Sequence, residues 1–164
     1  MSSGTHQLSG RSRLFLLAAL TTLSPFATDT VVPGLDAIAA GLDVTQAQAQ
    51  QTLSTYMFGV ALMALFHGAI SDAVGRRPVV LVGLALFSVA ALGCALAGDI
   101  QMLIVLRFIQ GLAGGAGMIV VRAMVRDALD GPPAQRLLSQ VMFVFAVAPA
   151  IAPIIGGFAV AEFG

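Results

Sequence analysis

Apolar residues dominate five long stretches of this chain, and short polar segments separate them. The stretches cover residues 14–35, 52–71, 79–98, 100–121 and 137–161. A helix needs about 20 mostly apolar residues to cross the roughly 30 Å hydrocarbon core of a bilayer, and every stretch is long enough. Strands would have to close into a barrel and would alternate apolar with polar positions, which these stretches do not do. The pattern therefore predicts an all-α polytopic membrane protein with five membrane-spanning helices.

The composition favours the same class of protein. Hydrophobic residues make up 58% of the 164 residues and charged residues 10%, against roughly 45–50% and 25% in soluble domains. The mean hydropathy is +0.95. Eight acidic residues balance eight arginines, so the net charge favours no nucleic-acid partner. The single cysteine, Cys94, excludes an intrachain disulfide and leaves no cysteine-based metal site.

The arginines predict the orientation of the spans, because connections rich in Lys and Arg stay in the cytoplasm. Seven of the eight lie before the first span, between the second and third, or between the fourth and fifth: Arg11, Arg13, Arg76, Arg77, Arg122, Arg126 and Arg136. The connections on the opposite side carry only acidic charges. We therefore expect the amino-terminal tail, residues 1–13, to be cytoplasmic.

The start of the chain allows two interpretations, and its end leads to an expectation about its length. A cleavable signal peptide is the competing interpretation of the start, because Arg11 and Arg13 precede an apolar run. A first span is favoured, since the run continues past Ala27 and four more stretches follow. The chain stops at Gly164, directly after the fifth stretch. An odd number of spans without a tail leads us to expect a truncated chain.

The connection between the second and third spans carries a compact motif. The residues that define it are Gly68, Asp72, Gly75, Arg76, Arg77 and Pro78. Gly75 allows a tight turn, and Pro78 can start the third helix at its first position. Asp72 at the end of a helix is unfavourable, because the negative end of the helix dipole repels it. We therefore expect another group to stabilise it, either another helix's amino terminus or Arg76.

Two charges lie within predicted spans, and intramembrane charges are functional candidates because burying them is costly. At about 1.5 Å per residue, Asp29 lies about 8 Å and Arg107 about 10 Å below the same surface. An ion pair between them is therefore allowed, and the alternative is that each reaches the interface separately. A carboxylate near a buried cation, in a cavity of changing hydration, can bind and release a proton.

The fourth and fifth spans contain helix-packing and helix-bending residues. Gln110 and Gly111 follow Arg107. Gly111 and the closely spaced glycines after it let another helix backbone approach, so we expect these glycines mainly to pack against a neighbouring helix. In the fifth span, Pro149 and Pro153 fall on one face and bend the helix. Two glycines follow these prolines: Gly156 and Gly157.

The second span offers candidate ligand contacts. Tyr56, Met57 and Phe58 present aromatic and thioether surface, although only one face of the helix can meet a cavity. Further along, His67 could relay protons because its charge changes near neutral pH, but an interfacial polar role is the favoured interpretation. His6 lies in the polar start. Because the sequence has no catalytic triad, phosphate loop or metal-ligand spacing, we expect neither an enzyme nor a metal site.

Several of these motifs together resemble the major facilitator superfamily. The loop resembles its cytoplasmic signature G-x-L-x-D-x-x-G-R-[RK], with Ile70 in place of leucine. Arg107–Gly111 and the residues after it resemble its fourth-helix signature R-x-x-Q-G-x-G, with Ala113 in place of the last glycine. Asp29–Pro33 resembles the acidic first-helix signature of drug exporters. Ala152–Gly157 resembles the antiporter signature G-P-x-x-G-G, with alanine for the first glycine. The set resembles most the bicyclomycin-resistance type of drug:proton antiporter.

The resemblance implies a twelve-helix carrier of the bacterial inner membrane. Residues 14–161 would form five of the first six helices, with the sixth span and the carboxyl-terminal half absent. The implied activity is export of small hydrophobic, drug-like compounds in exchange for protons by alternating access, with the proton gradient as energy source and no cofactor. The implied partners are substrate, protons, the lipid bilayer and the missing half.

The resemblance also implies residue roles. Asp29 and Arg107 would couple transport to protons. Asp72, Arg76 and Asp127 would form a cytoplasmic latch between the two halves, in which Asp72 caps a helix of the second half and Arg76 pairs with Asp127. The proline-containing signature is associated with exporters. Two other classes stay open: a small non-transporting membrane protein with a regulatory or assembly role, and an integral membrane enzyme.

Overall fold

The computed structural model describes the backbone of residues 10–163 and the side chains of residues 15–127 and 129–162. His6 and positions 1–9 of the predicted tail lie outside this part. The described elements are all helical: α1 (Gly10–Asp29), the 3-10 helix η1 (Val32–Gly34), α2 (Leu35–Gly41), α3 (Gln46–Val74), α4 (Arg76–Ala95), α5 (Ile100–Gly114), α6 (Ala116–Ala128) and α7 (Gly131–Phe163). The all-α prediction is confirmed for these residues.

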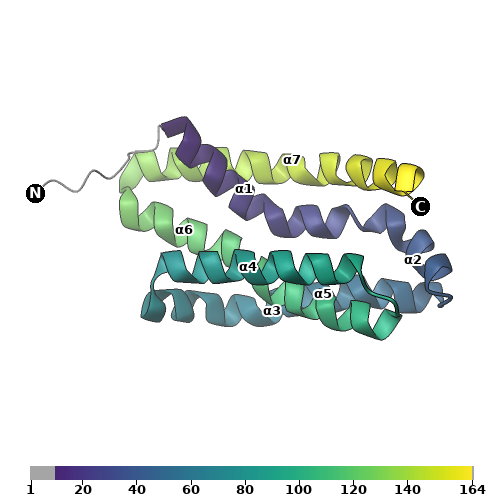
Figure 1. Cartoon of the computed structure of the whole chain (residues 1–164). Coiled ribbons are helices and arrows are strands. Elements are labelled where there is room, and N and C mark those ends of the chain that lie inside the picture. The colour runs from purple at the N-terminus through teal and green to yellow at the C-terminus, as the bar shows by residue number, and fades with distance from the viewer. Residues whose placement is uncertain (1–9, 164) are drawn as a thin grey trace, which may run out of the picture.

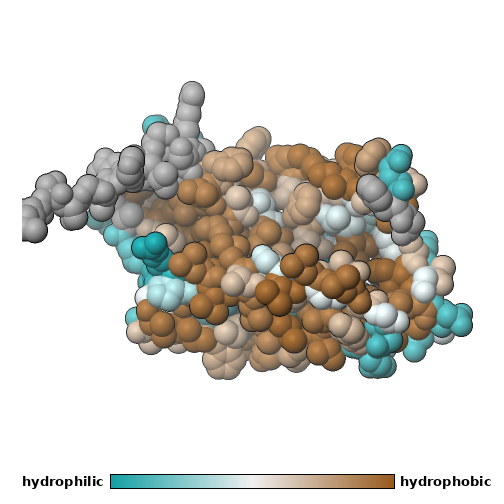
Figure 2. Space-filling model, in the orientation of Figure 1, coloured by the Kyte–Doolittle hydropathy of each residue, from teal (hydrophilic) through white to brown (hydrophobic). Residues whose placement is uncertain are grey.

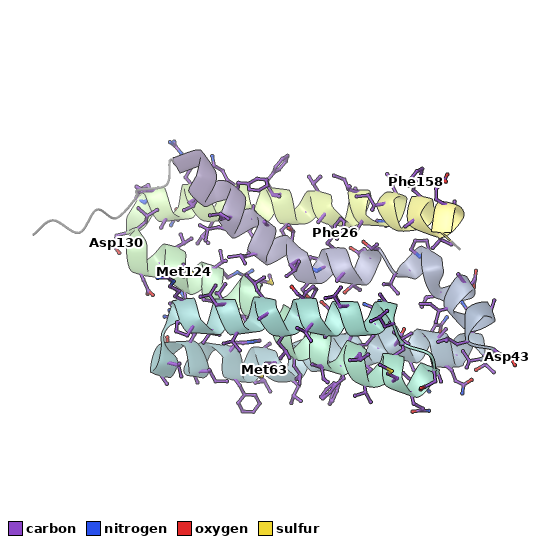
Figure 3. All side chains as sticks on the ribbon, in the orientation of Figure 1. Phe26, Asp43, Met63, Met124, Asp130 and Phe158 are labelled. Atoms are coloured by element: carbon purple, nitrogen blue, oxygen red, sulfur yellow. The ribbon has the colours of Figure 1, made fainter. Side chains whose placement is uncertain are left out.

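The helices form an elongated bundle in which successive spans run in opposite directions (Figure 1). α1 lies beside α7, whereas α3 and α4 pack against α5, and α6 connects the two groups by packing on α1, α3, α4 and α7. The α3–α4 and α6–α7 connections lie at the end of the bundle where α1 begins. Figure 3 places Asp130 at this end and Asp43 at the opposite one. The arginine-rich connections therefore share one end.

Five candidate membrane spans match the predicted five. They are Phe15–Gly41, Gln46–Val74, Arg76–Ala95, Ile100–Asp127 and Gly131–Glu162, each long and apolar enough to cross a bilayer. Apolar side chains cover the middle of the bundle and polar ones gather near its two ends (Figure 2). Large apolar side chains on this surface, which would be costly to expose to water, are suited to contact with lipid.

Local signals set the helix ends around α3 and α4. Thr45 caps α3, in a capping box with Gln48. Gly75 has φ +100°, a conformation that glycine adopts without the Cβ clash of other residues. The structure corrects the position of Pro78, because α4 begins at Arg76 and the proline is its third residue. It still lies in the first turn, where a missing amide donor breaks no helical hydrogen bond.

The first and fourth spans are interrupted, although both were predicted as continuous helices. α1 ends at Asp29, and a turn and the 3-10 helix precede α2. Pro33 lies in this interruption, and its missing amide donor agrees with a break in the α-helical ladder. In the fourth span, Gly115 lies between α5 and α6 and separates them. Its amide donates to the carbonyl of Ala113, two residues earlier.

Small residues bring helices together inside the bundle. A Cβ on Gly111 would collide with the backbone carbonyl of Tyr56, so α5 and α3 touch through their main chains. Gly117 of α6 approaches the carbonyl of Leu20 on α1 in the same way. These contacts confirm that the glycines of the fourth span pack.

Candidate functional site

A cavity of about 540 Å³ opens between α1, α3, the α5–α6 break and α7. We call it the Asp29 cavity, and its lining residues include Ser24, Asp29, Tyr56, Met57, Met118, Phe145 and Pro149. Its size falls within the roughly 300–1,000 Å³ typical of small-molecule sites. Mostly apolar walls with a few polar groups could hold a hydrophobic compound and orient it.

Tyr56 forms a rigid part of the cavity wall. Its side chain is 1% exposed, and its hydroxyl lies 2.8 Å from Ser24 Oγ and donates to the Ser24 carbonyl at 3.1 Å. These bonds join α3 to α1. Met57 beside it also lines the cavity but is 57% exposed. Tyr56 therefore fixes the wall, and Met57 offers an adaptable surface.

Phe58 was predicted as a possible substrate contact together with Tyr56 and Met57, but it is not among the residues that line the Asp29 cavity. It is 62% exposed and stacks on Phe108 of α5, with ring centroids 6.1 Å apart. The following residue, Gly59, packs against the backbone of α5. Successive residues of a helix point about 100° apart, so three consecutive side chains cannot all enter one cavity.

Asp29 and Arg107 do not form the ion pair that their similar depths allowed. Asp29 is the last residue of α1 and lines the cavity, half-buried. Arg107 Nη1 instead donates to Gln110 Oε1 at 3.1 Å, and its buried Nε has no hydrogen-bond partner among the described residues. The reason is lateral position, because α5 packs mainly on α3 and α4 and only slightly on α1.

The fourth-helix motif thus builds the inside of the bundle. Gln110 is 4% exposed, and its side chain accepts the bond from Arg107. Gly111 provides the backbone contact with Tyr56. The motif connects a buried guanidinium to the helix that forms the cavity wall.

A cluster at the arginine-rich end centres on Arg76, which we call the Arg76 cluster. Arg76 Nε donates to Asp127 Oδ2 at 3.1 Å, so the expected pair is present. The same guanidinium forms an ion pair with Asp72 and donates to Ser71 Oγ at 2.6 Å. Ser71 in turn donates to the carbonyl of Gly68. One side chain of α4 therefore connects α3 with α6, and Ser71 is a member that the sequence reasoning missed.

The remaining residues of the loop motif make few contacts. Arg77 is exposed and has no hydrogen bond or ion pair with any side chain the structure describes. A Cβ on Gly68 would meet nothing within 4 Å. Neither residue is required for packing in this arrangement.

The antiporter motif divides between two faces of α7. Ala152 and Gly156 are buried, and a Cβ on Gly156 would collide with the carbonyl of Thr30 just beyond α1. Pro149 lines the Asp29 cavity, whereas Pro153 is exposed and Gly157 has open space beside it. The buried small residues hold α7 against the end of α1, and only one proline reaches the cavity.

His67 lies inside the bundle, which corrects its interpretation as an interfacial residue. It is 3% exposed, and its Nδ1 has no hydrogen-bond partner among the described residues. The sequence signal was a single polar residue in an apolar span, which does not tell a buried position from an interfacial one.

Comparison with known proteins gives a consistent result. The profile of the Major Facilitator Superfamily matches residues 17–164. An uncharacterized MFS-type transporter of Bacillus subtilis, YdgK, is 37% identical over 155 residues, which cover 93% of this chain and 39% of the relative. A bicyclomycin resistance protein homolog of Haemophilus influenzae is 35% identical, covering 92% and 38%. The multidrug resistance protein MdtL of Escherichia coli is 37% identical, covering 84% and 35%. The chain thus spans less than half the length of these relatives.

Proposed function

Because the chain belongs to the Major Facilitator Superfamily, we propose that it is the amino-terminal part of a secondary transporter that exports small hydrophobic compounds in exchange for protons. The transporter is a multi-pass protein of the bacterial inner membrane, with the arginine-rich end in the cytoplasm. Residues 14–161 form five spans of its first half, and a sixth span and a second half complete it.

The Asp29 cavity is the observation that carries this proposal. It is bounded by α1, α3, the α5–α6 break and α7, so four of the five spans contribute to one hollow. Carriers of this class bind substrate between two halves that rock around a site near the middle of the membrane. In the complete transporter the cavity faces the second half and forms one side of the substrate site.

Asp29 is the proposed proton carrier. It is the acidic residue among those that line the cavity, and a carboxylate there loses or gains water as the cavity closes or opens. Desolvation disfavours the charged form, so closing promotes proton uptake and opening promotes release. Arg107 is proposed to act from behind the wall, through Gln110 and the α3–α5 contact at Tyr56, rather than by direct pairing in this arrangement.

The Arg76 cluster is the proposed cytoplasmic latch. Its two ion pairs join α3, α4 and α6 at the arginine-rich end, and their carboxylates are exposed. Exposed ion pairs contribute little to stability, so they can break and form again at small cost. That property suits a contact that must open in every cycle.

The outward direction of transport rests on two supports. The printed names of two relatives refer to bicyclomycin resistance and multidrug resistance, and removing a toxic compound from a cell requires export. The proline-containing motif of α7 resembles the signature of exporters. Its Pro149 lines the Asp29 cavity, and prolines inside helices can kink them, so this residue is placed to affect the shape of the site.

An apolar groove is the proposed seat of the sixth span. Its volume is about 980 Å³, and α1, α4, α6 and α7 line it with Leu17, Leu84, Val125 and Leu137 among others. The relatives are more than twice as long as this chain, so further spans are available to fill it. An apolar helix fits such a groove because its side chains replace lipid against leucine and valine.

Transport by the complete protein tests the proposal. We expect Asp29→Asn to abolish export driven by a pH gradient in inverted vesicles and to leave membrane insertion intact, because asparagine cannot carry the proton. Asp43→Asn is the matched control, since Asp43 is exposed and its φ of 51° suits asparagine. Equal gradient-driven rates for wild type and Asp29→Asn would remove Asp29 from the mechanism. Absence of any gradient-driven transport in wild type would favour the non-transporting alternative.

A further inference from the structure

His67 occupies a position between the two sites described above. It lies on α3 one helical turn beyond Ala64, which lines the Asp29 cavity, and one turn before Ser71 of the Arg76 cluster. It is 3% exposed, and Ser71 on the same face is 1% exposed. Its Nδ1 is buried and has no hydrogen-bond partner in the part of the chain that the structure describes. Leaving such a buried atom unpaired is costly, so the position calls for an explanation.

The neighbour of His67 across the bundle is the break in the fourth span. A Cβ added to Gly115 would lie 3.5 Å from His67 Nδ1, in ordinary van der Waals contact. At this residue the amide bonds to the carbonyl of Ala113, so the carbonyl of Gly111 loses its regular helical donor. An unpaired imidazole nitrogen and an interrupted helix therefore face each other at Gly115, which lines the cavity.

Charged groups occur on every helix packed against α3, but none forms a bond with His67. α3 packs on α2, α4, α5 and α6, and hydrogen bonds of Tyr56 join it to α1. The charged residues of these helices within the described side chains are Asp29, Asp36, Arg76, Arg77, Arg107, Arg122, Arg126 and Asp127, and on α3 itself there is Asp72. Where these charged side chains form hydrogen bonds or ion pairs, their partners are one another or residues other than His67. A charge on His67 would thus be uncompensated in the present arrangement.

We infer that His67 is a second proton-binding residue of the transport cycle, acting at the junction of the Asp29 cavity and the α5–α6 break. This inference rests on the proposed proton-coupled transport. Nδ1 takes the proton from water entering the cavity and later returns it to water. The imidazole gains and loses one positive charge, and no other bond forms or breaks.

The structure indicates how that proton would move a helix. A protonated imidazole is a donor and a charge, and both are unfavourable in a dry, unpartnered site. Protonation therefore favours an arrangement in which the break opens and offers carbonyl groups or water. α6 begins at this break, and Asp127 near its other end is held by Arg76. Movement at the break is passed along α6 to the latch.

The 164-residue chain allows a direct test, because His6 and His67 are its two histidines. In the His6→Gln variant, an imidazole ¹⁵N NMR signal from lipid bilayers comes from His67 alone. We expect it to titrate reversibly as the pH is lowered, and the amide signal of Gly115 to move with the same midpoint. Gly115→Ala identifies that signal, since a Cβ fits there. An imidazole that does not titrate, or that titrates while Gly115 stays unchanged, would overturn the inference.

The complete transporter gives an independent test. His67→Asn keeps a polar group close to the position of Nδ1 but cannot titrate. We expect His67→Asn to lose gradient-driven export but to retain substrate exchange in the absence of a gradient. His67→Gln should behave in the same way, and it serves as the second variant if one of the two inserts poorly. His6→Gln is the control. Full gradient-driven export by both His67 variants would contradict the inference. If wild type does not transport, the proposed function fails, and the NMR titration still decides whether His67 binds a proton and moves the break.

Discussion

Replacing Gly111 with alanine should separate the two helices that form the cavity wall. The Cβ of the alanine would collide with the backbone carbonyl of Tyr56, and a backbone atom cannot rotate away as a side-chain end can. α3 and α5 must therefore move apart. Tyr56 is almost fully buried and bonds to Ser24 on α1, so the displacement also strains the link to the first span.

The size of the effect follows from three contributions. Overpacking a well-packed site costs about 1–3 kcal/mol, and weakening the Tyr56 hydrogen bonds adds about 0.5–1.5 kcal/mol. The higher helix propensity of alanine offsets about 1 kcal/mol. We therefore expect Gly111→Ala to lower the free energy of unfolding by about 1–3 kcal/mol, which is roughly a fivefold to hundredfold change in the unfolded fraction at fixed denaturant.

Gly68→Ala is the matched control for this measurement. Gly68 is also a helical glycine, of α3, but a Cβ there would meet nothing within 4 Å. The gain in helix propensity is then the only expected effect, since no collision opposes it. The variant should be as stable as wild type or slightly more stable. Both can be followed by helical circular dichroism during SDS titration from mixed micelles. Equal stability of the two variants would refute the claim that α3 and α5 touch through their backbones.

Three further predictions test other contacts. Asp127→Asn should leave the unfolding midpoint nearly unchanged but speed amide hydrogen exchange in the last turn of α6, because an exposed ion pair restrains the helix end more than it stabilises the fold. Asp130→Asn, at the same end of the bundle, is the control and should not speed this exchange. Equal exchange rates in the two variants would contradict the prediction. Leu84 lines the apolar groove proposed for the sixth span. In a Cys94→Ala background, Leu84→Cys should react with a lipid-soluble maleimide in the 164-residue chain and be protected in the complete transporter. Equal labelling of the two would show that no helix fills the groove. Pro149→Ala should raise the free energy of unfolding by up to about 3 kcal/mol, because it restores a helical amide donor, and should slow transport. A less stable variant would mean that α7 needs this proline.

The sequence alone predicted the features that depend on position along the chain. Five apolar stretches of spanning length predicted five spans, and the arginines predicted which connections share an end. Gly75 was predicted to allow a tight turn, and it lies at the turn between α3 and α4. The Arg76–Asp127 pair followed from resemblance and is present. Each of these depends on local backbone chemistry or on distance along a helix axis, which residue counting supplies.

The tertiary structure decided which way each side chain faces. Depth placed Asp29 and Arg107 at one level, but α3 and α4 hold α5 away from most of α1, and the two do not pair. Phe58 faces outward, while His67 lies inside against the break at Gly115. In a span that is apolar all round, hydrophobic periodicity carries little information about rotation. Rotation is set instead by where small residues let backbones meet, such as Gly111 against Tyr56, and that depends on two distant segments at once.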